Sequence, residues 1–466
     1  MKKEKRVSAS FIYFFGAFGG ILFGYDIGVM TGALPFLQND WGLAGNASLI
    51  GWITSSVMLG AIIGGSLSGL LSDRLGRRKM ILISAIIFML GSLLSAAAPH
   101  NGSYFLIASR ILLGLAVGAA SALVPAYMSE MAPAHLRGRL SGINQVMIAS
   151  GMLLSYIVDY SLKGLPETIA WRSMLGLAAV PALILFFGVL ALPESPRFLI
   201  QAGRLEEAKQ VLRYIRTPEE AEQEFTQISQ NTRQEKTTTA SWHTLFSGKY
   251  RYLVMAGIGV AVFQQFQGAN AIFYYIPLIV EKATGHAASN ALMWPVIQGI
   301  ILVAGSLLFL VIADRFNRRT LLKIGGSVMG ISFILPALLG TVLDAHTNSI
   351  LIIFFLCLYV AFYSCTWAPL TWVLVGEIFP LAVRGRASGL ASSFNWIGSF
   401  LVGLLFPIMT ASMPQEFVFG IFGIICFLGV LFIQGLVPET RGKSLEEIEQ
   451  QTVRNHAPHS IFAKHS

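Results

Sequence analysis

Long apolar stretches separated by short polar ones recur along almost the whole chain. An α-helix rises about 1.5 Å per residue, so about 20 apolar residues cross the hydrocarbon of a bilayer. The pattern predicts twelve membrane-spanning helices, six before one long polar stretch and six after it. Their expected ranges are 11–37, 48–71, 80–98, 104–128, 140–158 and 171–192, followed by 252–279, 287–313, 321–342, 350–375, 387–409 and 417–436.

The first predicted span, residues 11–37, departs from a plain apolar pattern in two ways. Asp26 lies near its middle, where a carboxylate costs at least ~2.5 kcal/mol on insertion scales, so the acid should face a cavity or a partner. A proton or ion site is favoured for Asp26, and a permanent structural ion pair is the alternative. Glycine also recurs every fourth residue, which leaves one helix face bare for close packing. These glycines are Gly16, Gly20, Gly24, Gly28 and Gly32.

The composition supports a polytopic membrane protein and excludes a soluble one. Of 466 residues, 54% are hydrophobic and only 12% are charged, far from the balance of soluble domains. The net charge of +9 follows the positive-inside rule, because the connections after odd-numbered spans hold only Lys163, Arg172 and Lys282. Both termini are therefore expected in the cytoplasm, and the basic charge requires no nucleic acid partner.

The long polar stretch predicts a cytoplasmic linker. Leu205, Ala208, Leu212 and Ile215 keep helical spacing, and a second such pattern follows Pro218. Two short amphipathic helices packed on the membrane domain are expected, then a tether around residues 231–240. The chain is expected to divide into an N-terminal bundle (1–192), the linker (193–249), a C-terminal bundle (250–440) and a tail (441–466).

Three charged motifs occur twice. DRLGRR at residues 73–78 returns as DRFNRR at 314–319, the acid–arginine pattern of residues 130–139 returns at 377–386, and PESPR at 193–197 is echoed by PETR at 438–441. The repeats predict an all-α membrane protein of two homologous, pseudo-symmetric six-helix bundles. Parallel halves of this kind place a substrate site at their interface, near the middle of the bilayer.

The acids and arginines of these motifs are expected to form a gate between the halves at the cytoplasmic surface. Exposed ion pairs are worth little singly, but a network made in only one state biases a two-state equilibrium. The alternative, charges that only set topology, explains the arginines but not the regularly placed glutamates. The candidate gate residues are Asp73, Arg78, Glu130, Arg137, Glu194, Arg197, Asp314, Arg319, Glu377, Arg384, Glu439 and Arg441.

Amide and aromatic side chains are concentrated inside spans of the second half. A neutral ligand rich in hydroxyls needs bidentate amides and apolar walls, without unpaired charge. Gly268 lies between Gln265 and Asn270, and a helix break there would let the two side chains meet. The alternative for any single buried glutamine is a hydrogen bond between helices. The candidate residues for binding such a ligand are Gln145, Gln264, Gln265, Asn270, Tyr275, Trp372, Asn395 and Trp396.

Several phrases of the chain resemble the sugar porter family of the major facilitator superfamily: GYDIGVMTG, DRLGRRK, YMSEMAPAHLRGR, LPESPRFL, QQFQGANAIFYY and VPETRGKS. The resemblance covers nearly the whole chain and is strongest to bacterial proton-coupled xylose, arabinose and galactose transporters. Leu302 stands where relatives usually have an asparagine, and Ala368 and Asn317 replace glycines that are usual in the family, so the sugar preference stays open. The family's sugar-binding positions match Gln145, Gln264, Gln265, Asn270, Trp372 and Asn395.

Arg110 is the other charge inside a predicted span, and family members pair an acid with an arginine at the positions of Asp26 and Arg110. Such a pair, forming and breaking during transport, could bind a proton on one side and release it on the other. The resemblance and these residues together predict a plasma-membrane symporter that works by alternating access. It would import a proton with a monosaccharide, a pentose or hexose such as xylose, arabinose, galactose or glucose.

Other functions fit the sequence less well. Asp26 argues against an uncoupled facilitator, since facilitative relatives commonly carry an uncharged residue there. A sugar sensor usually needs a longer cytoplasmic domain than the tail after Arg441, and the amide-rich spans suit drug efflux poorly. No phosphate-binding loop or catalytic dyad indicates an enzyme or a pump. The expected partners are a monosaccharide, protons and the bilayer, with the chain working as a monomer and without cofactor or metal.

Overall fold

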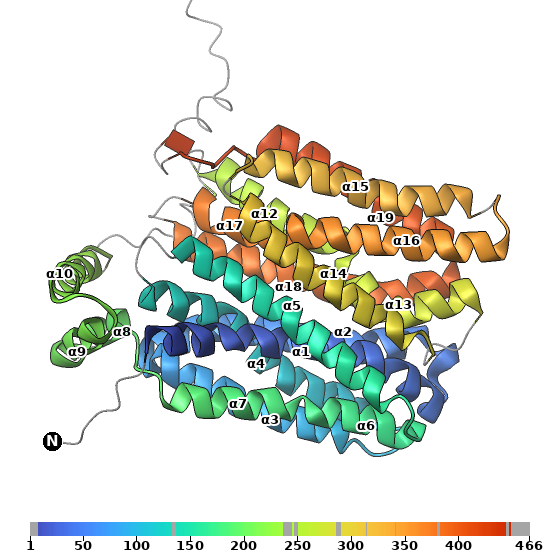
Figure 1. The fold of residues 1–466 in the computed structure, drawn as a ribbon, viewed down its shortest axis with the longest axis horizontal. Helices are drawn as coiled ribbons and strands as arrows, with labels where there is room; N and C mark the ends of the chain where they lie inside the picture. The colour runs from blue at the N-terminus through green and yellow to red at the C-terminus, as the bar shows by residue number, and fades with distance from the viewer. Residues whose placement is uncertain are drawn as a thin grey trace, which may run out of the picture.

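The computed structural model describes residues 8–132, 137–235, 245–246, 250–285, 290–313, 315–340, 342–379, 383–443 and 447–448. In this part of the chain nearly all residues are helical and no β-strand occurs. Figure 1 shows two bundles of long helices lying side by side, with a group of short helices at one end. The predicted all-α fold of two six-helix bundles is confirmed.

The first half consists of seven helices that make six spans, because the sixth is divided in two. They are α1 (Ala9–Trp41), α2 (Ala47–Leu75), α3 (Arg77–Ala96), α4 (Ser103–Met131), α5 (Arg137–Leu162), α6 (Glu167–Leu177) and α7 (Ala179–Leu190). A short 3-10 helix, η1 (Leu43–Gly45), joins α1 to α2.

The second half repeats this plan. Its helices are α12 (Arg251–Phe266), α13 (Ala269–Thr284), α14 (Met293–Ile312), α15 (Arg318–Leu339), α16 (Ala345–Cys365), α17 (Trp367–Ile378), α18 (Arg384–Ser412) and α19 (Gln415–Leu436), with the 3-10 helix η3 (Asn290–Leu292) before α14. Eleven helices of the described residues are long and apolar enough to cross a membrane. The remaining predicted span is divided into α12 and α13, which have 16 residues each.

Three predicted spans are broken rather than continuous. Gly268 has a φ of +90°, which ends α12 and begins α13, at the break that the sequence led us to expect. The other two breaks, at Ala178 and Thr366, were not expected. Pro181 and Pro369 follow them by three residues and have no N–H to give to the preceding turn. Proline therefore explains why these helices restart.

The glycine-bearing face of α1 packs directly on α5. A methyl group added to Gly24 would lie 1.9 Å from the carbonyl oxygen of Ile148, and one added to Gly28 would lie 1.8 Å from Oγ of Ser155. Only a residue without a side chain permits this approach of the two helices. The close packing predicted from the repeated glycines is confirmed.

The described residues of the linker form three helices, α8 (Pro196–Gln201), α9 (Leu205–Ile215) and α10 (Pro218–Glu235), at one end of the bundles (Figure 1). The two longer ones match the predicted helices, whereas α8 was missed. The expected tether was placed too early, because α10 continues to Glu235; residues 236–240 lie outside the described residues. We call this end of the bundles the linker end and the other the far end.

The two halves meet along α2 and α18 and along α5 and α14. Hydrogen bonds also join them towards the far end. Oγ1 of Thr31 donates to the carbonyl oxygen of Phe273 over 2.6 Å, and the hydroxyls of Thr54 and Tyr275 bond to each other. In this conformation the halves are held together at the far end.

Candidate functional site

Gln264 connects α12 to the break between α16 and α17. Its Nε2 atom donates to the carbonyl oxygens of Trp367 at 3.3 Å and Ala368 at 3.1 Å. These carbonyls lie just after the helix interruption at Thr366, in the first turn of α17. The glutamine is 3% exposed, so the broken helix and the buried amide satisfy each other.

Asn395, on α18, extends this contact to a second glutamine. Its Nδ2 donates to Oε1 of Gln264 at 2.7 Å and to the carbonyl oxygen of Ala261 at 2.8 Å. Its Oδ1 accepts a hydrogen bond from Nε2 of Gln265 over 3.2 Å. Gln264 and Gln265 are neighbours on α12, and Asn395 thus binds both.

Asn270 completes the series from the other side of the Gly268 break. Its Nδ2 donates to Oε1 of Gln265 over 2.9 Å and also to the hydroxyl of Ser399 on α18. We call Gln264, Gln265, Asn270 and Asn395 the amide chain. It is neutral, it joins α12, α13 and α18, and its groups are the kind that exchange partners with sugar hydroxyls.

The predicted aromatic residues differ in burial and in contacts. Tyr275 is buried, donates to the carbonyl oxygen of Gly403 over 2.8 Å and reaches Thr54 of the first half. Trp396 is buried and packs edge-on against Phe23 of the first half, with ring centroids 5.4 Å apart. Trp372 is 38% exposed on α17.

Gln145 is the sugar-binding candidate of the first half. It is half-buried on α5 and takes no part in the contacts of the amide chain. Hydrogen bonds therefore join the four amides of the second half, and among the described contacts none links Gln145 or Trp372 to them.

Asp26 on α1 and Arg110 on α4 face each other, as expected. Oδ1 of the aspartate lies 3.6 Å from Nη1 of the arginine, and both side chains are buried. Nε of Arg110 donates to the carbonyl oxygen of Ile53 on α2 over 3.0 Å.

This ion pair is loosely made. Oδ1 of Asp26 and both Nη atoms of Arg110 have no hydrogen-bond partner. The two groups are held by electrostatic attraction without direct hydrogen bonds between these atoms. A proton added to the carboxylate would remove this attraction.

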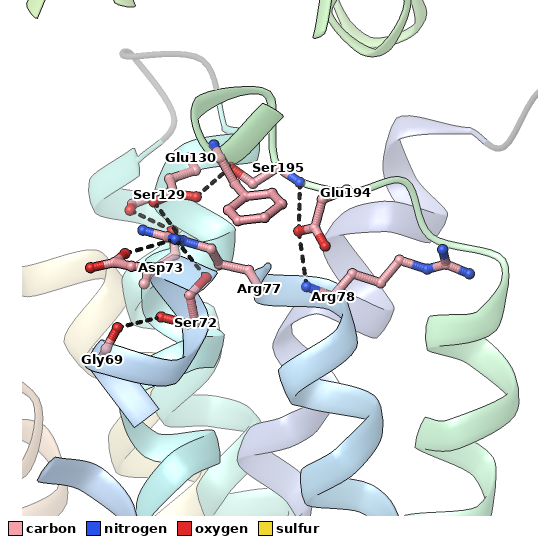
Figure 2. Close-up of polar contacts among 11 residues, drawn as sticks. Gly69, Ser72, Asp73, Arg77, Arg78, Ser129, Glu130, Glu194 and Ser195 are labelled. Carbon is pink, nitrogen blue, oxygen red and sulfur yellow. Dashed lines mark hydrogen bonds and ion pairs between the residues drawn. The ribbon is translucent and has the colours of Figure 1, made fainter. Parts of the chain in front are cut away.

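Charged residues of the first repeated motifs form one cluster at the linker end, drawn in Figure 2. Arg77 lies between two acids, with Nη1 2.9 Å from Asp73 and Nε 3.3 Å from Glu130. The hydroxyl of Ser195 donates to Glu130. Through these contacts the start of α3 is fixed to the ends of α2 and α4 and to the start of α8.

Glu194 belongs to the same cluster and caps the N-terminus of α3. Its carboxylate accepts the backbone N–H of Arg78 over 3.0 Å and that of Ser195 over 2.9 Å (Figure 2). An acid at a helix N-terminus satisfies free N–H groups and complements the helix dipole. The Arg78 side chain donates to the carbonyl oxygens of Val189 and Leu190, which ties α3 to α7.

The second half reproduces these contacts at the repeated positions. Nη2 of Arg318 lies 3.6 Å from Oε1 of Glu377, and the Thr440 hydroxyl donates to Oε2 of Glu377 over 2.6 Å. Glu439 accepts the backbone N–H groups of Arg318 and Arg319 over 3.0 and 3.1 Å. The sequence repeat is therefore also a repeat of contacts.

The contacts described for the gate candidates lie within one half or the other. Nε of Arg384 donates to the carbonyl oxygen of Phe379, and the backbone N–H of Arg441 donates to Glu439. Arg197 lies in α8. Asp314 and the side chain of Arg137 lie outside the described residues.

Sequence reasoning missed several functional candidates. Arg77 and Arg318, rather than their neighbours, pair with the glutamates that recur in each repeat, and the doubled arginine gave no means of choosing between them. Asp159 is buried on α5. It lies one residue beyond the predicted end of the fifth span, so one more turn of apolar pattern would have included it.

The sequence matches the family model described as "Sugar (and other) transporter" over residues 12–451. It is 42% identical over 448 residues to the D-xylose transporter of Levilactobacillus brevis, with 96% of each chain covered. It is 36% identical over 467 residues to the galactose-proton symporter of Escherichia coli (strain K12), with 99% of this chain and 98% of that one covered.

Solved structures share the fold. The proton:xylose symporter XylE bound to 6-bromo-6-deoxy-D-glucose, of the major facilitator superfamily, is 32% identical, with a TM-score of 0.79, and the match covers 95% of this chain and 98% of that one. The inward open conformation of the xylose transporter XylE from E. coli gives a TM-score of 0.82 at 32% identity, covering 95% and 99%. The similarity therefore includes both halves and the linker.

Proposed function

Because this chain belongs to the sugar transporter family of the major facilitator superfamily, we propose that it imports a monosaccharide together with a proton. It is a multi-pass membrane protein, and we place it in the plasma membrane with both termini and the linker end in the cytoplasm. The distribution of basic residues supports this orientation. The far end then faces the outside.

The amide chain is the observation that carries the sugar assignment. Gln265 and Asn395 each use both ends of their amides, and each group exchanges one neutral hydrogen bond for another when a hydroxyl arrives. Trp396 and Phe23 offer apolar ring faces from opposite halves. A neutral polyol held between the halves would contact both, and the names of the relatives point to pentoses and hexoses.

The Asp26–Arg110 pair is the proposed coupling site. A proton that reaches Asp26 from outside neutralises the carboxylate and removes its attraction to Arg110. The loaded carrier then changes faces, and the proton leaves to the cytoplasm as the pair forms again. Uphill sugar uptake follows if the empty carrier returns only with Asp26 ionised and paired.

The two clusters at the linker end are the proposed gate. In this conformation their described contacts hold each half together, as with Arg77 and Glu130 in one and Arg318 and Glu377 in the other. We propose that the same charges exchange partners across the halves when the linker end closes. A network present in only one state shifts the balance between the states.

Uptake into proteoliposomes tests the function directly. Labelled xylose, arabinose, galactose and glucose are offered separately, with an inward proton gradient and with the gradient collapsed by a protonophore. We expect one or more sugars to accumulate above their outside concentration only with the gradient. Equal filling under both conditions would identify an uncoupled facilitator, and no uptake of any sugar would contradict sugar transport.

A further inference from the structure

Asp159 is a second acid within the bundle, and neither the amide chain nor the Asp26–Arg110 pair uses it. It lies on α5, one turn before the far end of that helix, and is 1% exposed. Among the described residues neither of its carboxyl oxygens has a hydrogen-bond partner. Asp26 faces an arginine, whereas Asp159 has no ion-pair partner in the described part of the chain.

The backbone of α1 lies directly against this carboxyl group. A methyl group added to Gly32 would come within 2.2 Å of Oδ2 of Asp159 and within 2.4 Å of its carboxyl carbon. The missing side chain at Gly32 is therefore what makes room for the acid. The close contact also excludes water from that side of the carboxyl group.

The ionisable groups around Asp159 do not supply a counter-charge, and Lys163, four residues further along, has its Nζ 3.9 Å from the ring centroid of Tyr160. Tyr25 on α1 and Tyr156 on α5 are buried phenols, as is Tyr274 on α13, and α14 has no ionisable side chain. On α6, Glu167 accepts a hydrogen bond from Asn39, and Arg172 donates to the carbonyl oxygens of Ala96 and Ala98. The two acids of α1 have partners of their own: Asp26 faces Arg110, and Asp40 accepts hydrogen bonds from Thr168 and Trp171.

The second half covers the neighbours of Asp159 on both helices. Thr31, next to Gly32, donates to Phe273 of α13. Tyr156, one turn before Asp159, packs against α14, where a methyl group added to Gly299 would lie 3.0 Å from its ring. The burial of Asp159 thus depends on contact between the halves at the far end, and separation of the halves there would admit water to it.

An ionised carboxylate cannot be buried without a partner at acceptable cost, whereas a protonated one can. We propose that Asp159 is a second proton-binding site, which holds a proton whenever the far end is closed and exchanges it with outside water when the far end opens. The assignment rests on the proposed function only for the orientation, in which the far end faces the outside.

Proton linkage predicts how the ratio of open to closed protein changes with pH. The closed state holds one proton more than the open state once Asp159 ionises in the open state. Raising the pH then favours the open state, by up to about tenfold per pH unit for one proton. Removing the carboxyl should remove this contribution and leave the far end closed over the same pH range.

Pulsed electron–electron double resonance can measure the opening of the far end without sugar or a proton gradient. Spin labels are placed on Ala44→Cys, in the exposed turn between α1 and α2, and on Ser412→Cys, at the exposed end of α18. The native cysteines, Cys357, Cys365 and Cys426, are first replaced. The label distance is measured from acid to alkaline pH in four proteins: the parent, Asp159→Asn, Asp159→Ser and the matched control Asp344→Asn, an exposed acid that caps the far end of α16.

The parent and Asp344→Asn should shift to longer distances as the pH rises, while both Asp159 variants keep the short distance. Either Asp159 variant suffices, because both remove the titrating group. A parent that shows no pH response, or Asp159 variants that respond like the parent, would overturn the proposal. Uncoupled sugar uptake together with a pH response that depends on Asp159 would instead contradict the proposed symport alone.

Discussion

The polar groups buried in the two halves differ in kind. In the second half, the amide chain is neutral: Gln265 and Asn395 each donate and accept within it, and Gln264 accepts from Asn395 and donates to backbone carbonyl oxygens of α17. The first half also buries charged and ionisable groups within its spans. Oδ1 of Asp26, both Nη atoms of Arg110 and both carboxyl oxygens of Asp159 have no hydrogen-bond partner there.

This difference indicates a division of work between the halves. Neutral amides give up one hydrogen bond for another at little net cost, so they suit a ligand that arrives and leaves. Buried charges without full partners depend on a proton or a movement for their stability, so they suit coupling. Sugar recognition in the second half and proton coupling in the first should therefore be separable by substitution.

Among the substitutions that test this division, removal of Arg110 should lower the stability most. Arg110→Ala leaves the Asp26 carboxylate buried without its cation, and breaking a buried ion pair costs about 3–5 kcal/mol. We expect a large fall in thermal stability in detergent at neutral pH, and a smaller fall at acid pH, where a proton neutralises Asp26. The double variant Asp26→Asn/Arg110→Ala is the matched control and should recover part of the loss. A double variant no more stable than the single one would show that the loss of stability comes from lost packing and not from the unpaired charge.

Shortening Gln265 should affect sugar binding while leaving the fold intact. Gln265→Ala removes two contacts of the amide chain, and we expect sugar binding to weaken by about 1–3 kcal/mol. Equilibrium binding of labelled sugar to purified protein measures this. Gln267→Ala is the control, since that side chain faces Gly429 on α19. Equal losses of affinity in both variants would remove Gln265 from the sugar site.

Substitutions in the linker-end clusters should have the smallest effects on stability, and the effects should differ between the two clusters. The Glu130 side chain is 9% exposed and 3.3 Å from its arginine, whereas that of Glu377 is 37% exposed and 3.6 Å away. Water screens the second pair more, so Glu130→Gln should cost more stability than Glu377→Gln, which we expect to cost about 1 kcal/mol or less. Thermal unfolding of the two variants side by side measures this order, and the reverse order would contradict it.

Glu377→Gln also tests the proposed gate. If Glu377 helps to close the linker end in another state, its neutralisation should favour the conformation open at that end. Cysteines placed on the linker-end faces of α5 and α14 should then react faster with a polar thiol reagent than in the parent. Reaction rates equal to those of the parent would leave the cluster with a purely structural role.

The sequence predicted the features that follow from helical repeats and insertion costs. The spans, the two halves, the bare face of α1 and the meeting of Asp26 with Arg110 all depend on patterns that the bilayer enforces over many residues. The break at Gly268 was also predictable, because only it allows Gln265 and Asn270 to meet.

What the sequence did not reveal depends on local geometry. The breaks at Ala178 and Thr366 occur inside uniformly apolar runs, where one proline does not disclose whether a helix bends or restarts. Asp159 resembled the end of a span, because its burial comes from contact with α1 at Gly32. The partners of the linker-end charges belong to one conformation, and no sequence pattern fixes which.

Asp26→Asn in proteoliposomes tests the division of work most directly. Asparagine keeps the shape of the side chain but carries no titrating proton, so the carrier should behave as if permanently protonated. Proton-driven accumulation of sugar should disappear. Sugar counterflow needs only the loaded carrier to change faces, so it should survive and should no longer depend on the protonation of residue 26. If Asp26→Asn still concentrated sugar against its gradient, the coupling site would lie elsewhere and the separation of charge from sugar recognition would be wrong.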